Sequence, residues 1–129
     1  MILVDTSVWV DHLRAADGTL ADLLDRGLVL GHPWVAGELA LGGLRQREVV
    51  LGLLAGLPRA VVATAAEVAR FIESHRLYGL GIGYVDVQLL AATRLTADAL
   101  LWTRDRRLAV AAGRLEVAAA FPAESPCGA

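Results

Sequence analysis

The chain has 129 residues, which is the length of one domain and enough to bury a core without disulfides or metal staples. It has no apolar run of the roughly 18 residues that a membrane helix needs and no basic leader at its start. Its single cysteine, Cys127, can form neither an internal disulfide nor a zinc site. These features argue against a membrane protein and a disulfide-rich secreted domain, and we expect a cytoplasmic protein.

Hydrophobic residues make up 56% of the chain, which is a high share for so small a domain. We therefore expect part of the apolar surface to lie in an interface and the protein to be a homodimer, although an unusually large core would explain the same composition. The segments with the most apolar surface to spare are 49–57 and 65–77.

The first half of the chain alternates short apolar runs with segments of helical periodicity. In chain order we expect a strand at 1–4, a helix at 7–16, a turn at 17–18, a helix at 19–27, a strand at 28–30, and helices at 33–45 and 46–57. Thr19 and Asp22 form the pattern of a capping box, Gly27 suits a helix end, and Pro33 suits the first position of a helix.

The second half continues this alternation after Pro58. In chain order we expect a strand at 59–64, a helix from 65 to about 79, a glycine-rich loop at 79–83, a largely buried helix at 84–97, a strand at 99–103, a short helix from 104, and a fifth candidate strand at 115–118. This alternation predicts one α/β domain over residues 1–121, with a central parallel sheet of four or five strands and a loose tail at 122–129.

Four acidic residues stand at unusual positions. Asp5 and Asp105 follow predicted strands, and ligands of open α/β sheets bind beyond the carboxyl ends of the strands. Glu38 and Asp86 share helix faces with apolar residues. Burying an unpaired carboxylate costs on the order of several kcal/mol, and a hard cation removes that cost because Mg²⁺ and Mn²⁺ prefer oxygen ligands. The four acids therefore predict a site for Mg²⁺, or alternatively Mn²⁺.

Each of these acids also has a structural explanation. Asp5 and Asp105 could cap the helices that follow them, and Asp86 could stabilise the first turn of its own helix. Glu38 could pair with Arg45, which is also on the predicted helix at 33–45. A shared site explains all four positions at once, whereas the structural explanations need four separate coincidences.

Ser7 and Thr103 lie next to two of the acids, and each hydroxyl could hold Asp5 and Asp105 in place or orient a metal-bound water. The histidines are scattered and are not expected to bind metal. Most other acids are expected at solvated positions or caps, namely Asp11, Asp17, Asp22, Asp25, Asp98, Glu48, Glu67 and Glu73. Among them, Asp11 lies close behind the predicted site and could orient Arg14.

The net charge of −2 argues only at first sight against a nucleic-acid partner. If bound cations neutralise the four acids, ten acidic residues remain against twelve basic ones, all of them arginines. Arginine is the better bidentate phosphate clamp, although biased codon usage also explains the absence of lysine. Without lysine, a receiver domain and a P-loop hydrolase are excluded. Ser7 stands where an aspartyl phosphatase needs a second aspartate, and the glycines at 79–83 lack dinucleotide-binding spacing.

Four strings of the sequence together resemble the PIN-domain ribonucleases, in particular the VapC-type toxins of bacterial and archaeal toxin–antitoxin pairs. The strings are DTSVWVDHLR at 5–14, PWVAGEL at 33–39, YVDVQLLAA at 84–92 and LLWTRDRRL at 100–108. The resemblance spans about residues 1–121 and implies a PIN-like three-layer α/β/α fold. It matches the family's acidic quartet to Asp5, Glu38, Asp86 and Asp105, and its polar neighbours to Ser7 and Thr103.

The resemblance implies an Mg²⁺-dependent endoribonuclease that acts as the toxin of a type II toxin–antitoxin pair. Asp5 and Asp86 are expected as direct metal ligands, and Glu38 and Asp105 are expected to complete the shell, partly through water. The arginines that flank the last acid could grip the RNA backbone or form a solvated helix face. They are Arg104, Arg106 and Arg107.

The resemblance also implies a cognate antitoxin. Trp9, Leu13 and Trp34 are expected to line a groove in which an apolar antitoxin segment docks, although both tryptophans could instead be core residues. The alternative function is a non-catalytic RNA- or protein-binding module on the same fold, and the intact acidic quartet argues against it.

Overall fold

The computed structural model describes residues 1–121, so the tail expected at 122–129 lies outside the described residues. Three parallel strands form its centre in the order β2-β1-β3: β1 (Ile2–Val4), β2 (Val29–Leu30) and β3 (Leu100–Trp102). Ile2 pairs with Val29 on one side and with Leu100 on the other. The first and the fourth predicted strands are therefore neighbours, and their carboxyl ends meet at one edge.

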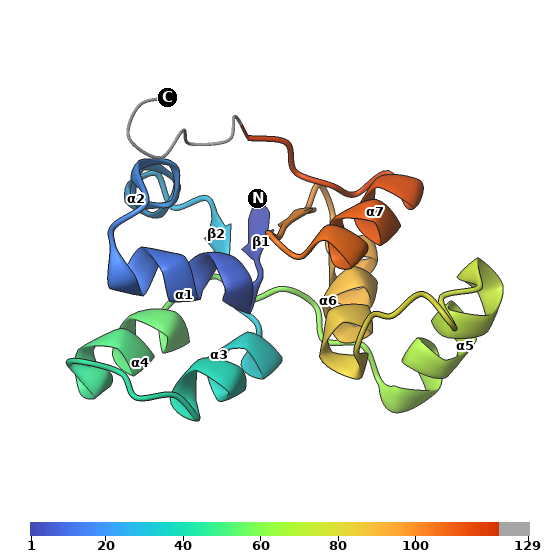
Figure 1. The fold of residues 1–129 in the computed structure, drawn as a ribbon, viewed down its shortest axis with the longest axis horizontal. Coiled ribbons are helices and arrows are strands. Elements are labelled where there is room, and N and C mark those ends of the chain that lie inside the picture. Colours follow the sequence, from blue (N-terminus) through green and yellow to red (C-terminus); the bar gives the residue numbers. More distant parts are fainter. Residues whose placement is uncertain (122–129) are drawn as a thin grey trace.

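Helices flank the sheet on both sides, as expected for an α/β domain (Figure 1). In chain order they are α1 (Thr6–Arg14), α2 (Gly18–Asp25), α3 (Pro33–Ala40), α4 (Arg47–Ala55), α5 (Ala65–His75), α6 (Tyr84–Leu95) and α7 (Arg106–Arg114). Figure 1 shows α1 to α4 gathered on one side of the strands and α5 to α7 on the other. None of the helices in the described part of the chain is long and apolar enough to cross a membrane.

The sheet is smaller than the four or five strands that the sequence predicts. The segments expected as strands at 59–64 and 115–118 each contribute a single parallel bridge, Gly31 to Arg59 and Leu101 to Ala118. Pro58 has no N–H for a ladder, and the Val61 N–H is diverted to the Thr96 hydroxyl at 2.9 Å. The pairing of the 59–64 segment with the residue after β2, Gly31, therefore stops after one residue.

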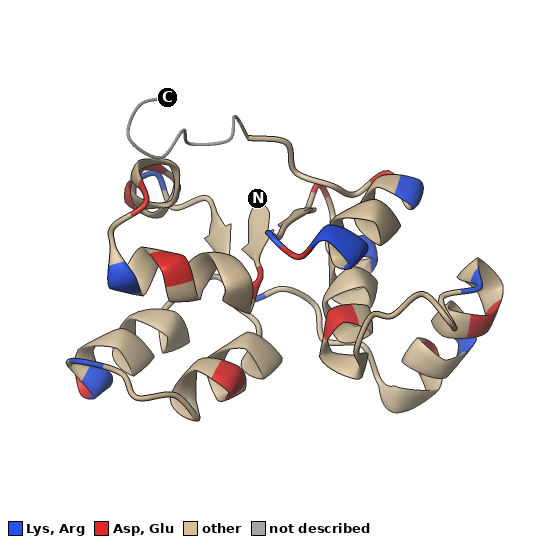
Figure 2. Cartoon of the chain, viewed as in Figure 1, with Lys and Arg blue, Asp and Glu red and all other residues tan. Residues whose placement is uncertain are grey.

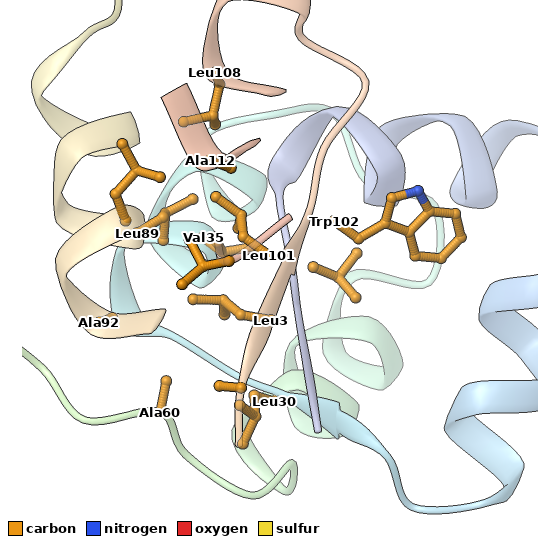
Figure 3. Close-up of a cluster of buried hydrophobic side chains, with 14 of the residues drawn as sticks. Leu3, Leu30, Val35, Ala60, Leu89, Ala92, Leu101, Trp102, Leu108 and Ala112 are labelled. Carbon is orange, nitrogen blue, oxygen red and sulfur yellow. The ribbon is translucent and has the colours of Figure 1, made fainter. Parts of the chain in front are cut away.

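The core lies between the strands and the helices that cover them (Figure 3). Leu3 on β1 and Leu101 on β3 are fully buried, and they lie among side chains of α6 and α7. On α6 the seven consecutive residues from Val87 to Thr93 are buried, which confirms the prediction of a largely buried helix. Full burial of a leucine stabilises the fold by about 1.5–3 kcal/mol, so this layer fixes α6 and α7 against the strands.

Several helix ends differ from the prediction. The helix expected at 33–45 ends at Ala40, because the glycines at 42 and 43 favour irregular backbone. The expected capping box at Thr19 is wrong, since Asp17 caps α2 by accepting from the Leu20 N–H at 3.0 Å. A capping box does form in α5, where Thr64 and Glu67 cap each other.

Candidate active site

Asp5 lies at the carboxyl end of β1 and is almost fully buried. Its Oδ2 accepts hydrogen bonds from the hydroxyls of Ser7 and Thr103, both at 2.7 Å. The carboxylate makes no capping hydrogen bond to α1, although Asp5 stands at the N-cap position. The capping explanation for Asp5 is therefore wrong, and its side chain is held by polar neighbours from both strand ends.

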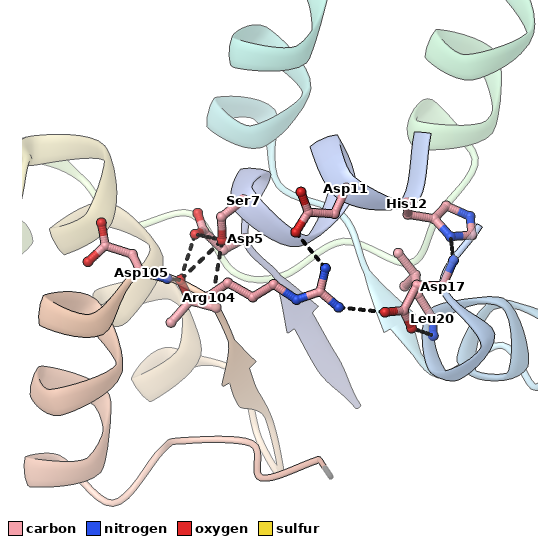
Figure 4. Close-up of polar contacts among 9 residues, drawn as sticks. Asp5, Ser7, Asp11, His12, Asp17, Leu20, Arg104 and Asp105 are labelled. Carbon is pink, nitrogen blue, oxygen red and sulfur yellow. Dashed lines mark hydrogen bonds and ion pairs between the residues drawn. The ribbon is translucent and has the colours of Figure 1, made fainter. Parts of the chain in front are cut away.

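The loop between β3 and α7 is fastened to Asp5 by the same two hydroxyls. Ser7 Oγ accepts from the Arg104 N–H at 3.0 Å, and Thr103 Oγ1 accepts from the Asp105 N–H at 3.1 Å. Asp105 itself caps α7, because its Oδ1 accepts from the Leu108 N–H at 3.0 Å. The capping explanation for Asp105 is thus correct for one oxygen, and the side chain extends away from Asp5 (Figure 4).

Glu38 reaches the same region from α3, but it is exposed rather than turned into the core as expected. Its Oε1 accepts from the Thr6 hydroxyl at 2.6 Å, which ties α3 to the start of α1. Within residues 1–121 it forms no ion pair with Arg45, so that structural explanation is wrong. Sequence reasoning missed Thr6, whose only signal was its place directly after Asp5.

Asp86 completes the acidic group from the first turn of α6. Its Oδ2 accepts from the Gly83 N–H at 3.0 Å, so the first-turn explanation holds in part. Burial raises the pKa of Asp86, and the negative charges of Asp5, Asp105 and Glu38 raise it further, against the lowering effect of the Gly83 N–H. The other three predicted carboxylates therefore lie close enough to Asp86 to repel its negative charge.

The acidic group is loosely spaced. Among the described residues, no three His, Cys, Asp or Glu side chains are grouped so that they could hold a metal ion by themselves. Carboxylate oxygens are nevertheless the donors that Mg²⁺ prefers, and this ion is usually held by one or two carboxylates while it keeps several waters. The donor chemistry of the group fits such an ion.

The side chain of Arg104 pairs with two acids that do not belong to the predicted acidic group. Its guanidinium donates to Asp11 at 2.7 Å and to Asp17 at 2.5 Å, and it lies 5.6 Å from the centre of the Trp102 ring (Figure 4). Arg104 is therefore paired within the fold, and its contact with RNA stays a prediction. Asp11 orients Arg104 rather than Arg14.

Asp17, one of the two acids paired with Arg104, is buried rather than solvated. It also caps α2, which is one of the two roles that the sequence allowed for it. Burial raises the pKa of Asp17, but hydrogen bonds from the Leu20 N–H and from Arg104, together with the positive charge of Arg104, bring it below its ordinary value. Partial burial lowers the pKa of Arg104, but the hydrogen bonds and negative charges of Asp11 and Asp17 bring it above its ordinary value. The cluster of Asp11, Asp17 and Arg104 is a structural clamp between α1, α2 and the loop before α7.

Arg106 and Arg107 are exposed at the start of α7, and neither forms an ion pair within residues 1–121. Figure 2 shows this basic stretch next to an acidic residue. Arg107 lies against Gly81, which has a φ of +75° and where an added Cβ would come within 2.4 Å of Arg107 Nη1. The glycine-rich loop thus leaves room for this arginine.

The three residues expected to contact an antitoxin differ in exposure. Trp9 is 2% exposed and belongs to the core, so its predicted contact is wrong. Leu13 is exposed and lines a groove of about 550 Å³ beside Glu38, together with Val10 and Leu44. Trp34 is 41% exposed and lines a second cavity, whose lining shares Glu38 with the first.

Comparison with known proteins agrees with this architecture. A family model described as PIN domain matches residues 2–114. Two proteins named Ribonuclease VapC32, from Mycobacterium tuberculosis strains CDC 1551 and H37Rv, are each 52% identical to this chain over 120 residues. The match covers 93% of this chain and 97% of each relative. The chain therefore belongs to the PIN-domain family and is a VapC-type member of it.

Proposed function

We propose that this protein is a divalent-metal-dependent endoribonuclease and the toxin of a type II toxin–antitoxin pair. The observation that carries the proposal is the acidic group of Asp5, Glu38, Asp86 and Asp105. Three of its members repel the charge of the fourth, Asp86, and none forms an ion pair with a basic side chain of residues 1–121. The ribonuclease name of the two relatives supports RNA as the substrate.

Asp5 and Asp86 are the proposed direct ligands of Mg²⁺ or Mn²⁺, and Glu38 and Asp105 are proposed to act partly through water. When bound, such an ion supplies an activated water and stabilises negative charge on the phosphoryl oxygens. Ser7 and Thr103 occupy Oδ2 of Asp5 with two hydrogen bonds, which leaves Oδ1 without a hydrogen bond from the described residues.

Three other contacts position the remaining ligands. The Gly83 N–H holds Asp86, the Thr6 hydroxyl holds Glu38, and the cap on α7 holds Asp105. Such supporting hydrogen bonds fix the orientation of metal-binding side chains. Arg106 and Arg107, whose charges are not paired within the described residues, are proposed to bind phosphates of the RNA backbone.

The test is cleavage of labelled RNA by the purified protein with Mg²⁺ and with a chelator. We expect cleavage only with the metal, and we expect Asp5→Asn to lower the rate by at least about a hundredfold. Asp22→Asn is the matched control, because Asp22 lies on the surface of α2 in an exposed pair with Arg26. If Asp5→Asn cleaves as fast as the parent protein, the assignment of the site is wrong.

The alternative function is a non-catalytic RNA- or protein-binding module on the same fold. It predicts binding of RNA without cleavage at any Mg²⁺ concentration. The unpaired acidic group disfavours this alternative, because carboxylates that repel one another stabilise neither the fold nor a contact with RNA phosphates. The same cleavage assay therefore separates the two functions.

A toxin that cuts cellular RNA needs a cognate antitoxin, and the groove beside Glu38 is its proposed docking site. Val10 and Leu13 on α1 and Leu44 after α3 provide apolar walls, while Arg14 and Arg45 provide positive charge at the rim. An apolar segment with a neighbouring acidic residue fits this chemistry. A basic side chain of the same segment would compete with the metal for Glu38 and Asp5.

Co-expression with the small open reading frame next to this gene tests the antitoxin. We expect growth to recover, the two proteins to co-purify, and Leu13→Glu to weaken the complex. Val110→Glu on α7 is the control, because Val110 is exposed outside the groove. If the neighbouring product neither binds nor restores growth, the antitoxin proposal fails while the nuclease proposal stands.

We also propose a homodimer, with a narrower interface than the sequence suggested. Val49 and Leu53 on α4 are exposed large apolar side chains, whereas the segment 65–77 has none. Light scattering at tens of micromolar should give the mass of a dimer, and Leu53→Glu should shift it toward the monomer. A monomeric parent protein would contradict the proposal.

A further inference from the structure

A cavity of about 380 Å³ lies between α7 and the glycine-rich loop at 79–83. Leu80 of the loop lines it together with five residues of α7, which are Arg106, Arg107, Val110, Ala111 and Arg114. Half of the lining residues are therefore arginines, and none of the described residues that line the cavity is acidic. Figure 2 shows basic residues at both ends of α7. The cavity thus carries positive charge along the length of this helix.

The three arginines of this cavity have no counterion in the fold. None of them forms an ion pair within residues 1–121, whereas Arg104, just before α7, shares two acids. Like charges that line one cavity repel each other, and its apolar walls, such as Leu80 and Ala111, strengthen the field between them. An anion that enters the cavity removes this repulsion, so the lining has the chemistry of an anion-binding site.

Two of these arginines are held in place by backbone rather than by acids. Arg107 lies against Gly81, whose φ is +75° and where any side chain would collide with the guanidinium. Arg114 Nη2 donates to the carbonyl of His75, the last residue of α5, at 2.6 Å. A carbonyl fixes the side chain without neutralising it, and the guanidinium keeps further N–H donors. Both side chains are therefore ordered and still charged, which lowers the cost of ordering them around a ligand.

The cavity starts at the acidic group and leads away from it. Arg106 directly follows Asp105, and Arg114 comes eight residues later on the same helix. A helix rises by about 1.5 Å per residue, so these two arginines are separated by roughly 12 Å along α7. Phosphates of one stacked strand repeat about every 3.4 Å, so Arg106 and Arg114 cannot hold the same phosphate. A strand with its cleaved phosphate at the acidic group would bring a later phosphate to Arg114.

We propose that this arginine cavity is a second phosphate site, which holds the RNA backbone about two to four nucleotides from the cleaved bond, and that Arg114 is a positioning residue there. The inference rests on the proposed nuclease function and adds a directional requirement to it: the RNA must extend past the cleaved bond on the side of α7. Phosphate contacts carry no sequence information, so this requirement concerns the length of the RNA and not its sequence.

The first measurement is the affinity for a fluorescently labelled single-stranded RNA of mixed sequence over a series of potassium chloride concentrations, with a chelator to block cleavage. Arg114→Gln keeps an N–H donor for the His75 carbonyl and removes the charge. We expect it to weaken binding about fourfold at 0.15 M salt and to reduce the slope of log affinity against log salt concentration by about 0.7, the loss of one phosphate contact. Arg47→Gln is the matched control, because Arg47 is exposed at the start of α4 and lies outside the cavity. A purely structural Arg114 would change the melting temperature and leave the salt slope unchanged.

The second measurement uses an RNA that the parent protein cleaves in Mg²⁺, trimmed one nucleotide at a time from each end toward the mapped cut. On one side only, KM should rise in a step when trimming removes the phosphate at Arg114. The kcat should stay unchanged, because a contact remote from the reacting atoms binds substrate and transition state equally. Arg114→Gln should lack this step and keep the rest of the length dependence.

The inference is overturned if Arg114→Gln reduces the salt slope no more than Arg47→Gln, or if parent and variant respond alike to trimming at every position. The nuclease proposal would stand in both cases. Weaker antitoxin capture by Arg114→Gln with unchanged RNA affinity would assign the cavity to an acidic segment of the protein partner, which also overturns the inference. If the parent protein binds no RNA and cleaves none in Mg²⁺, the proposed function fails together with this inference.

Discussion

The loop from Thr103 to Asp105 lies between two acidic groups that differ in one respect. On one side, Asp11 and Asp17 share the guanidinium of Arg104 at 2.7 and 2.5 Å. On the other side, Asp5, Glu38, Asp86 and Asp105 have no ion pair among residues 1–121. The pKa of Asp17 is lowered, whereas the pKa of Asp86 is raised, although both carboxylates lose contact with water.

This difference separates a structural acid from a candidate functional one. Burial raises the pKa of any carboxylate, and a fixed cation more than offsets that effect at Asp17. At Asp86 the neighbouring charges have the same sign, so burial and repulsion act together. Arg104 is the residue before Asp105 and could have neutralised the acidic group, but its side chain extends in the other direction (Figure 4). Among residues 1–121, the acidic group is thus left without a positive charge of its own.

The largest expected effect on activity comes from Asp86→Asn. An asparagine can still accept from the Gly83 N–H, but it cannot bind a metal as a carboxylate does. We expect the rate of RNA cleavage to fall at least about a hundredfold, which is about 2.7 kcal/mol in the activation barrier. Without divalent metal the same variant should unfold at a higher temperature than the parent, because a folded pKa above the unfolded one makes the ionised carboxylate destabilising at neutral pH. Lower activity with lower stability would contradict this account.

Arg104→Met should disrupt the paired acidic group, because it removes the cation that Asp11 and Asp17 share. It leaves Asp17 buried without its cation, and loss of one partner of a buried ion pair costs about 3 kcal/mol. Urea unfolding at neutral pH measures this loss. The cleavage rate per folded molecule should change by less than about threefold, because only the backbone N–H of Arg104 contacts the residues around Asp5. The exposed Arg106→Met serves as the stability control.

Local sequence patterns predicted the features that depend on chain direction and periodicity. Asp5 and Asp105 follow strands, and parallel strands present their carboxyl ends at one edge, so their shared location followed from the α/β pattern. The buried character of α6 was visible in its nearly continuous apolar residues. Glu38 and Asp86 were added to the site from the apolar residues that share their helix faces, and the resemblance to PIN-domain proteins matched all four acids to the family's quartet. The family membership is confirmed.

Contacts between distant segments were not predictable in this way. Arg104 meets Asp17 across 87 positions of sequence, and nothing near either residue marks the other as its partner. Trp9 and Val10 are adjacent apolar residues of α1, so periodicity could not decide which one faces the core, and the exposed one is Val10. The segment at 59–64 has the composition of a strand, but the Val61 N–H donates to the hydroxyl of Thr96 at a distant helix end instead of to a neighbouring strand.

His32 tests whether burial without any charged partner is enough to shift a pKa. Burial lowers the pKa of His32 from 6.5 to about 4. Between these two values the unfolded chain binds a proton that the folded chain does not, so stability should fall by about 2.5 kcal/mol as the pH drops through this window. His32→Asn keeps an acceptor for the Trp34 N–H and removes the titration, so its unfolding free energy should vary less between pH 6.5 and 4.

His32→Ala is the control for that experiment, because it also removes the titration but loses the cap. The free energy of unfolding of His32→Ala should be lower than that of His32→Asn by about 1 kcal/mol at every pH. Both variants should show the same flattened pH dependence. An unchanged pH dependence in both variants would mean that burial does not lower the pKa of His32 in the folded protein.

The smallest effect should appear when metal is added to the folded protein at neutral pH. An ion that binds only the folded state stabilises it by RT ln(1 + [L]/Kd), which is about 1.4 kcal/mol at ten times Kd and raises Tm by roughly 5 °C. Mg²⁺ should raise Tm in the parent protein and in Asp17→Asn, which disturbs only the neutralised group, but not in Asp5→Asn or Asp86→Asn. Potassium chloride at matched ionic strength controls for screening, which acts on both groups. An equal Mg²⁺ shift in all four proteins would place the ion outside the acidic group.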